Sequence, residues 1–131
     1  MQYHKQSNTT LEALNRLVWE HLDERDWLGN TPRSYATSIA VEAAELLEHY
    51  QFSEQPVGDK AALASELADV LIYCFQYAIH TDIDMAEAVR IKLAQSAEKY
   101  PAASQKGKTR EQQHAAWLQA RTNHRATKKG L

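Results

Sequence analysis

Several features are missing from this 131-residue sequence, and each absence excludes a class of protein. The single cysteine, Cys74, cannot form an internal disulfide or bind zinc with a second cysteine, so we expect a buried small hydrophobe there. No run approaches the roughly 18 apolar residues of a membrane span, and the polar segment 1–10 lacks the apolar core of a secretory signal. These absences predict a cytoplasmic protein with no membrane partner.

The sequence also lacks a strand pattern, an internal repeat and the Gly-x-x-x-x-Gly-Lys loop that binds phosphates in many nucleotide-binding proteins. No serine, cysteine or histidine stands in a recognisable nucleophile arrangement, so we expect no covalent enzyme intermediate. What the chain does contain is helix-forming sequence. The pattern predicts helices over 11–26, 32–50, 60–80 and 85–100, with a weaker one over 109–123.

Local signals place the ends of these helices. Thr9 and Glu12 form a capping-box pattern before the first apolar stripe, and Thr31 followed by Pro32 is typical of a helix start. The helix over 60–80 is apolar around most of its circumference, which indicates burial among other helices. Four short helices of one chain can hardly cover it. We therefore predict an all-α four-helix bundle that is completed by homo-oligomerisation.

Charge is distributed unevenly along the chain, although the net charge is only −2. Residues 1–105 carry 8 basic and 16 acidic side chains, whereas residues 106–131 carry 7 and 1. We expect 1–105 to form the domain and 106–131 to be a basic C-terminal tail, partly helical or disordered. A solvated terminus is favoured over a nucleic-acid-binding one, so no nucleic acid partner is expected.

Two pairs of carboxylates stand three residues apart on two predicted helices: Glu42 with Glu45, and Glu66 with Asp69. This spacing puts each pair on one side of its helix. Between Arg33 and Glu48 the only charged residues are Glu42 and Glu45, and between Lys60 and Asp82 the only ones are Glu66 and Asp69. A solvent-facing surface normally mixes charges of both signs. If the carboxylates of the two helices face each other, any two neighbouring negative charges repel by ~3 kcal/mol at an effective dielectric constant near 20. Such crowding requires either a bound cation or the uptake of protons. Carboxylate ligands suit a hard cation, so the arrangement predicts Mg²⁺ or Mn²⁺.

A ferritin-like di-iron site also uses glutamates inside a helical bundle, but it requires Glu-x-x-His on two helices. The residues three after Glu42 and Glu66 are Glu45 and Asp69, so neither helix supplies that histidine. The di-iron alternative is therefore disfavoured.

With these motifs in place, the sequence resembles the MazG-like all-α nucleoside triphosphate pyrophosphohydrolases, most closely the dCTP pyrophosphatase branch. The matching segments are 24–27 (ERDW), 31–33 (TPR), 41–46 (VEAAEL), 66–73 (ELADVLIY) and 92–101 (KLAQSAEKYP). The resemblance implies that magnesium is held by Glu42, Glu45, Glu66 and Asp69. It also implies that the nucleoside contacts Trp27, Phe52 and Tyr73, and that the oligomer is a homodimer or homotetramer.

The fourth predicted helix carries Lys92, Ser96 and Lys99 on one face, as candidate contacts to the substrate. In the dCTP pyrophosphatase branch a tryptophan is usual at Phe52, an asparagine at Ser96 and an arginine at Lys99. Phe52 still offers a ring face, whereas the shorter Ser96 loses an amide. The preferred nucleobase is therefore left open.

The resemblance implies attack of water on the α-phosphorus of a (deoxy)nucleoside triphosphate. The expected substrate is dCTP or a modified pyrimidine nucleotide. Magnesium on the phosphate oxygens acts as Lewis acid, and one carboxylate accepts the proton of the water. Two alternatives remain open from the sequence: a phosphoribosyl-ATP pyrophosphohydrolase, and a non-catalytic helical module that binds a nucleotide or a protein partner.

Overall fold

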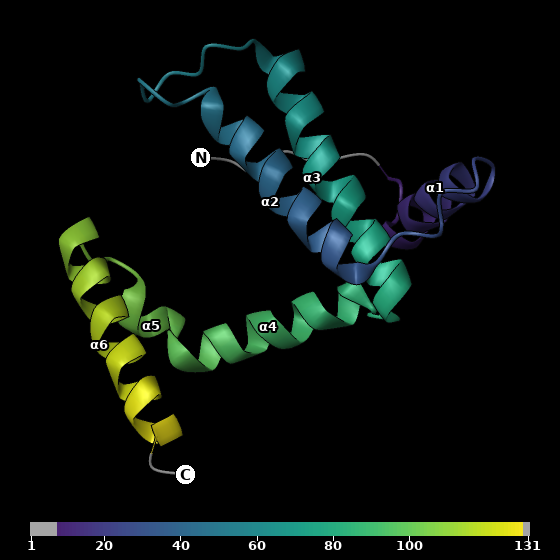
Figure 1. Cartoon of the computed structure of the whole chain (residues 1–131). Helices are drawn as coiled ribbons and strands as arrows, with labels where there is room; N and C mark the ends of the chain where they lie inside the picture. The colour runs from purple at the N-terminus through teal and green to yellow at the C-terminus, as the bar shows by residue number, and fades with distance from the viewer. Residues whose placement is uncertain (1–7, 130–131) are drawn as a thin grey trace. The chain divides into compact units, whose positions relative to one another are not determined.

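The computed structural model describes residues 8–129, and over that range the chain is all-α, as predicted (Figure 1). Its helices are α1 (Leu11–Asp23), α2 (Pro32–Glu48), α3 (Lys60–Thr81), α4 (Met85–Lys99), α5 (Ala102–Gln105) and α6 (Arg110–Lys129). The chain divides into two compact units between Asp84 and Met85. The four expected helices and the extra C-terminal helix are all present.

The first helix differs from its prediction at both ends. The N-cap is Thr10, not Thr9, because the Thr10 side chain accepts the backbone N–H of Ala13. The helix was expected to run to about Asp26 but ends at Asp23. Asp26 adopts a left-handed backbone with φ 55°, and the N–H of Trp27 donates to the Leu22 carbonyl at 2.9 Å. This left-handed turn closes the helix before the chain reaches Gly29.

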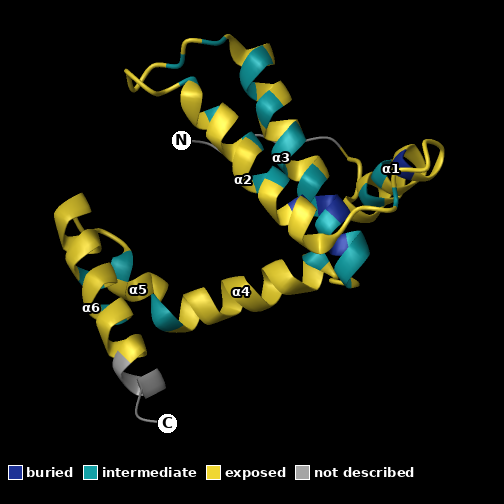
Figure 2. Ribbon diagram, viewed as in Figure 1, coloured by how far each residue is buried: buried dark blue, intermediate teal, exposed yellow. Residues whose placement is uncertain are grey.

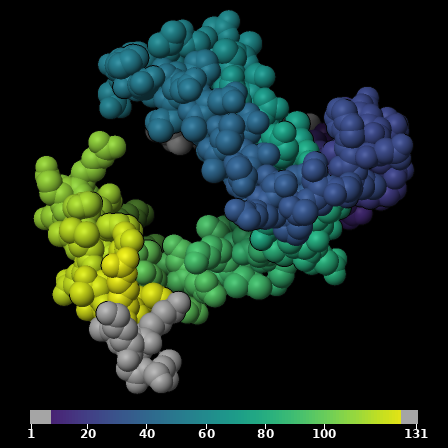
Figure 3. Space-filling view, viewed as in Figure 1, coloured from purple at the N-terminus to yellow at the C-terminus, as the bar shows by residue number. Residues whose placement is uncertain are grey.

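Helices α2 and α3 form a hairpin, and α1 packs on α3 (Figure 1). Thr31 caps α2 and Asp59 caps α3, each through its side-chain oxygen. In the space-filling view the side chains of the two hairpin helices make one continuous blue-to-teal surface (Figure 3). All four predicted metal-binding carboxylates are on this hairpin.

The core of the N-terminal unit is small and lies where α1, α2 and the C-terminal half of α3 meet. Its buried residues, dark blue in Figure 2, are Leu22, Tyr35, Phe75, Gln76 and Ala78. Inside this core the Tyr35 hydroxyl lies 3.3 Å from Nε2 of His80, and that nitrogen lies 2.8 Å from the Leu28 carbonyl oxygen. The connection between α1 and α2 is thereby fixed to α3.

Helix α3 is less buried than its composition predicted. Helices α1 and α2 pack against α3, yet within one chain Leu67 and Leu71 remain 51% and 49% exposed. Cys74 is half-buried, not fully buried as expected, and this burial raises the pKa of its thiol. Apolar surface that one chain leaves uncovered supports the prediction of an oligomer, which stays a prediction.

By length and composition alone, α3 could cross a membrane, and no other helix among the described residues could. One such helix is weak evidence, since the core helix of a soluble protein passes the same test. The expectation that no segment spans a bilayer therefore remains a prediction, as does the cytoplasmic location.

The C-terminal unit contains α4, α5 and α6. Helix α4 ends at Lys99, one residue short of the predicted range. A short helix that the sequence did not suggest begins directly after Pro101. The weak helix expected over 109–123 is present and longer, as α6. The proposed domain boundary after Gln105 stays a prediction.

Candidate metal and nucleotide site

Three of the four predicted metal ligands come together between α2 and α3. Glu42, Glu45 and Glu66 each offer a carboxylate oxygen, and these oxygens all lie within 4.8 Å of one another. Glu42 and Glu66 are half-buried, whereas Glu45 is exposed. Asp69 is outside this group of three. It is half-buried one turn along α3, and its negative charge still acts on Glu42.

The electrostatics of the cluster fit a cation. Partial burial raises the pKa of Glu42, and the negative charges of Glu45, Asp69 and Glu66 raise it further. A raised carboxyl pKa means that the site resists the accumulation of negative charge. Carboxylate oxygens at this separation suit a hard divalent ion such as magnesium, which binds through few carboxylates and keeps positions for water and phosphate. The residues present therefore fit a magnesium ion.

A histidine that the sequence did not single out borders the cluster. Nε2 of His49, the C-cap residue of α2, lies 3.8 Å from Oε1 of Glu66. Nδ1 of the same ring accepts the backbone N–H of Gly58 at 3.1 Å. The only sequence signal was the position of His49 one turn after Glu45, and this signal does not indicate Glu66, which is on another helix.

The three predicted nucleoside-contacting aromatics differ in their surroundings. Phe52, in the loop after α2, is 89% exposed, and Trp27, in the loop after α1, is 55% exposed. Their exposure excludes a core role for either within one chain. Tyr73 is half-buried and lies on α3 one turn after Asp69. The ring of Trp27 lies 6.0 Å from that of His21 in an edge-on arrangement.

Lys92, Ser96 and Lys99 line one pocket of the C-terminal unit, with a volume of about 630 Å³. His124 of α6 lines the same pocket and was not predicted, because nothing in its local sequence connects it with α4. The ammonium of Lys99 lies 5.3 Å from the ring centre of Tyr100, which also borders the pocket. The lining also contains the carboxylate of Glu98, so the groups suited to an anionic ligand are the two lysines and the Ser96 hydroxyl.

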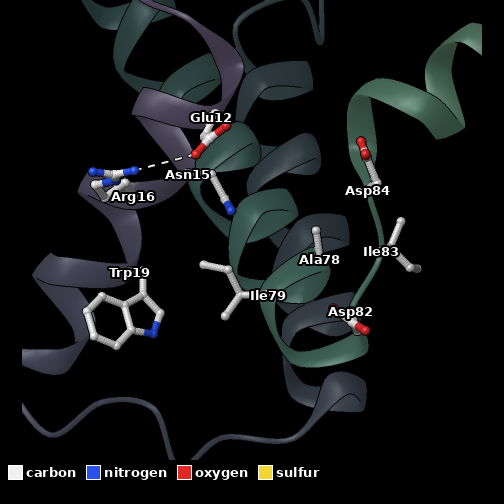
Figure 4. A pocket seen from close by; sticks show the side chains of 9 residues that line it. All are labelled: Glu12, Asn15, Arg16, Trp19, Ala78, Ile79, Asp82, Ile83 and Asp84. Carbon is white, nitrogen blue, oxygen red and sulfur yellow. Dashed lines mark hydrogen bonds and ion pairs between the residues drawn. The ribbon is translucent and has the colours of Figure 1, made fainter.

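Another pocket, of about 480 Å³, lies between α1 and the C-terminal end of α3 and is shown in Figure 4. Arg16 and Trp19 from α1 flank it, opposite Ile79 of α3, and Arg16 pairs with Glu12 at 3.4 Å. It contains none of the predicted site residues, so it does not enter the proposed function.

Known proteins are similar to this chain in sequence and in structure. Residues 37–114, more than half of the chain, match the MazG-like family. The chain belongs to this family. It is 35% identical to dCTP pyrophosphatase 1 of Mus musculus over 101 residues and 36% identical to dCTP pyrophosphatase 1 of Homo sapiens over 102 residues. A crystal structure of a pyrophosphatase from Archaeoglobus fulgidus DSM 4304 is similar, with a TM-score of 0.64 and 33% identity.

The coverage of these matches differs. The mouse and human alignments include 70% and 71% of this MazG-like chain but only 59% and 60% of the relatives' own length. The archaeal alignment includes 77% of this chain and 99% of the archaeal chain. The MazG-like match begins after Trp27 and ends before His124. It includes both carboxylate pairs, Phe52, Tyr73 and the α4 residues of the pocket.

Proposed function

We propose that this MazG-like chain is a nucleoside triphosphate pyrophosphohydrolase that releases pyrophosphate from a (deoxy)nucleoside triphosphate and requires magnesium. The carboxylates that α2 and α3 bring together, with the raised pKa of Glu42, are the observation that carries the proposal. The names of its relatives, dCTP pyrophosphatase 1 and pyrophosphatase, support the same reaction. We propose dCTP or a modified pyrimidine nucleotide as the substrate.

In this proposal Glu42, Glu45, Glu66 and Asp69 hold the ion. When bound, magnesium supplies positive charge to the phosphate oxygens as negative charge develops on them. One of the carboxylates accepts the proton of the water that attacks the α-phosphorus, and pyrophosphate leaves. Lys92 and Lys99 contact the phosphates, and Ser96 contributes a hydroxyl.

The aromatic residues supply the nucleoside contacts in this proposal. The exposed faces of Trp27 and Phe52 and the half-buried ring of Tyr73 are suited to stacking on a base. Stacking tolerates different bases, because every base has a π-face, so the choice of base depends on further polar contacts.

The proposed reaction can be tested with a panel of nucleotides incubated with the protein and millimolar magnesium, followed by chromatography of the products. We expect dCTP to yield dCMP and pyrophosphate, and phosphoribosyl-ATP to remain intact. Cleavage of phosphoribosyl-ATP alone would reassign the reaction within the pyrophosphohydrolases. Tight nucleotide binding without any product would identify a non-catalytic binding module.

Replacing Phe52 or Trp27 by alanine should weaken substrate binding without disturbing the metal. Loss of one stacked base costs ~1–3 kcal/mol, so we expect KM for dCTP to rise about 5- to 150-fold. The stabilisation by magnesium, measured as the shift in Tm without nucleotide, should equal that of the wild type. Trp117→Ala, which removes an indole from α6, is the matched control and should leave KM unchanged. An unchanged KM in both Phe52→Ala and Trp27→Ala would remove these rings from the proposed site.

A further inference from the structure

We infer that His49 is a positioning residue for the Glu66 carboxylate, and that Gly58 sets the orientation of the His49 ring. The inference rests on the metal-dependent function proposed above and adds a residue that is not itself one of the metal-binding carboxylates. His49 ends α2, and the loop that follows turns back so that Gly58 lies beside its ring. A second backbone bond, from the N–H of Val57 to the His49 carbonyl at 2.9 Å, closes the same turn.

The hydrogen bond from Gly58 determines which ring nitrogen carries the proton. A neutral imidazole has one nitrogen that donates and one that accepts. Because Nδ1 accepts the N–H of Gly58 at 3.1 Å, the proton of the neutral ring is on Nε2. Nε2 is the nitrogen that lies 3.8 Å from Oε1 of Glu66. The loop therefore directs an N–H group toward the carboxylate.

Glycine at position 58 is required for this arrangement. A β-carbon there would overlap Cε1 and Nδ1 of the His49 ring and would also crowd the β-carbon of Ala62. The ring could avoid the overlap only by rotating away, and it would then lose both the Gly58 bond and its approach to Glu66. Glycine thus serves here for the close approach of backbone to side chain, not for a special backbone angle.

The contact matters because of what surrounds it. The His49 and Glu66 side chains are 18% and 23% exposed, so their interaction is only partly screened by water. No lysine or arginine is present on α2 between Arg33 and its C-terminus, or on α3 after Lys60, so His49 is the nitrogen donor that these two helices bring to Glu66. At 3.8 Å the contact is longer than a direct hydrogen bond. It therefore acts by orienting the carboxylate, as outer-shell groups do at metal sites.

Two conservative substitutions separate the two sides of the ring. In His49→Gln the amide nitrogen reaches about as far as Nε2 and can still face Glu66, whereas in His49→Asn the amide oxygen takes the place of Nδ1 and keeps only the Gly58 bond. Outer-shell substitutions typically weaken metal binding ~10-fold or more. We expect His49→Asn to raise the half-saturating magnesium concentration about 10-fold and His49→Gln to change it by less than about 3-fold.

The magnesium dependence should be measured in two ways, as the rise of Tm without nucleotide and as the rate of pyrophosphate release. At saturating magnesium, kcat should stay near the wild-type value in both variants, because the site is then filled. A purely structural role, in which His49 only holds the loop, predicts the reverse order, since asparagine keeps the loop contact. That reverse order, or equal magnesium response in all three proteins, would overturn the inference.

Gly58→Ala provides an independent test, because it displaces the ring without changing its chemistry. It should weaken magnesium binding as His49→Asn does, and combining the two should add no further loss, as for residues that act through one interaction. Additive losses would contradict the inference. His114→Asn, a substitution of an exposed histidine on α6, is the matched control and should behave as wild type. If the Tm of the wild type does not respond to magnesium, the proposed metal site is overturned as well. If the wild type responds and the variants respond equally, only the role of His49 is overturned.

Discussion

Glu42→Gln should release pyrophosphate from dCTP at least about 100-fold more slowly than the wild type in the presence of magnesium. Without metal, it should nevertheless be no less stable than the wild type. The loss of activity follows from the loss of a carboxylate that lies within 4.8 Å of two others. The stability effect has a separate cause. Partial burial and the charges of Glu45, Asp69 and Glu66 raise the pKa of Glu42 in the folded chain. The amide removes one of these crowded negative charges.

The sign of the pH dependence follows from this shift. A carboxyl whose pKa is raised on folding binds its proton more tightly in the folded state than in the unfolded state. The favourable contribution of this carboxyl group to the free energy of unfolding is fully present below its ordinary pKa of 4.5. It is lost as the pH rises through the pKa of the folded state. Glu42→Gln should therefore gain free energy of unfolding over the wild type near neutral pH, and this gain should disappear below about pH 4.5. Denaturant unfolding with a chelator at both pH values measures it.

Glu48→Gln is the matched control for this experiment. Glu48 is an exposed carboxylate on the same helix and is outside the cluster of three. It should keep activity, the rise of Tm with magnesium and the pH profile of the wild type. The Tm of Glu42→Gln should rise less with magnesium, because an ion stabilises a protein only in proportion to its affinity for the folded state. Full activity and an unchanged magnesium response in Glu42→Gln would mean that its carboxylate only faces solvent.

Leu71→Glu should convert an oligomeric wild type into a 14.9 kDa monomer. Leu67 and Leu71 lie one turn apart on α3 and stay about half exposed within one chain. Burying each leucine in a subunit interface is worth about 1.5–3 kcal/mol, and burying an unpaired carboxylate instead costs several more. A symmetric interface would contain the change on both sides, which doubles the effect. Sedimentation at micromolar concentration, with a parallel measurement of Tm, tests this.

Leu118→Glu tests whether any exposed leucine gives the same result. Leu118 is on α6, in the segment 106–131 that we expect to be outside the folded domain, and is exposed to a similar degree. It should leave the sedimenting mass and Tm unchanged. A wild type that sediments only as a 14.9 kDa species would show that the apolar surface of α3 is not a subunit interface.

The helices could be predicted because their signals are local. Asp59 and Thr31 stand directly before helices and cap them, and Pro101 follows one. The two errors in α1 are both shifts of a helix end by a few residues. Thr9 and Thr10 each carry a hydroxyl group that can cap a helix, and the left-handed turn at Asp26 forms without a glycine. Local sequence does not distinguish between such neighbours.

What depended on folding in three dimensions was harder to predict. The spacing of Glu42, Glu45 and Glu66 indicated one face of each helix, and the structure brings the two faces together. Burial of α3 could not be deduced from composition, because an apolar surface can be covered by its own chain or by another subunit. His49 was missed because its role depends on a loop that returns Gly58 to its ring.

All four carboxylates and the His49 contact belong to one hairpin, α2 and α3 with the loop between them. Helical hairpins form through contacts between residues near in sequence, which is the class of contact that forms fastest during folding. On the ribosome this hairpin is synthesised before α4, α5 and α6. The chain can therefore assemble its metal ligands while it is still being translated, before the segment that carries Lys92 and Lys99 has been made.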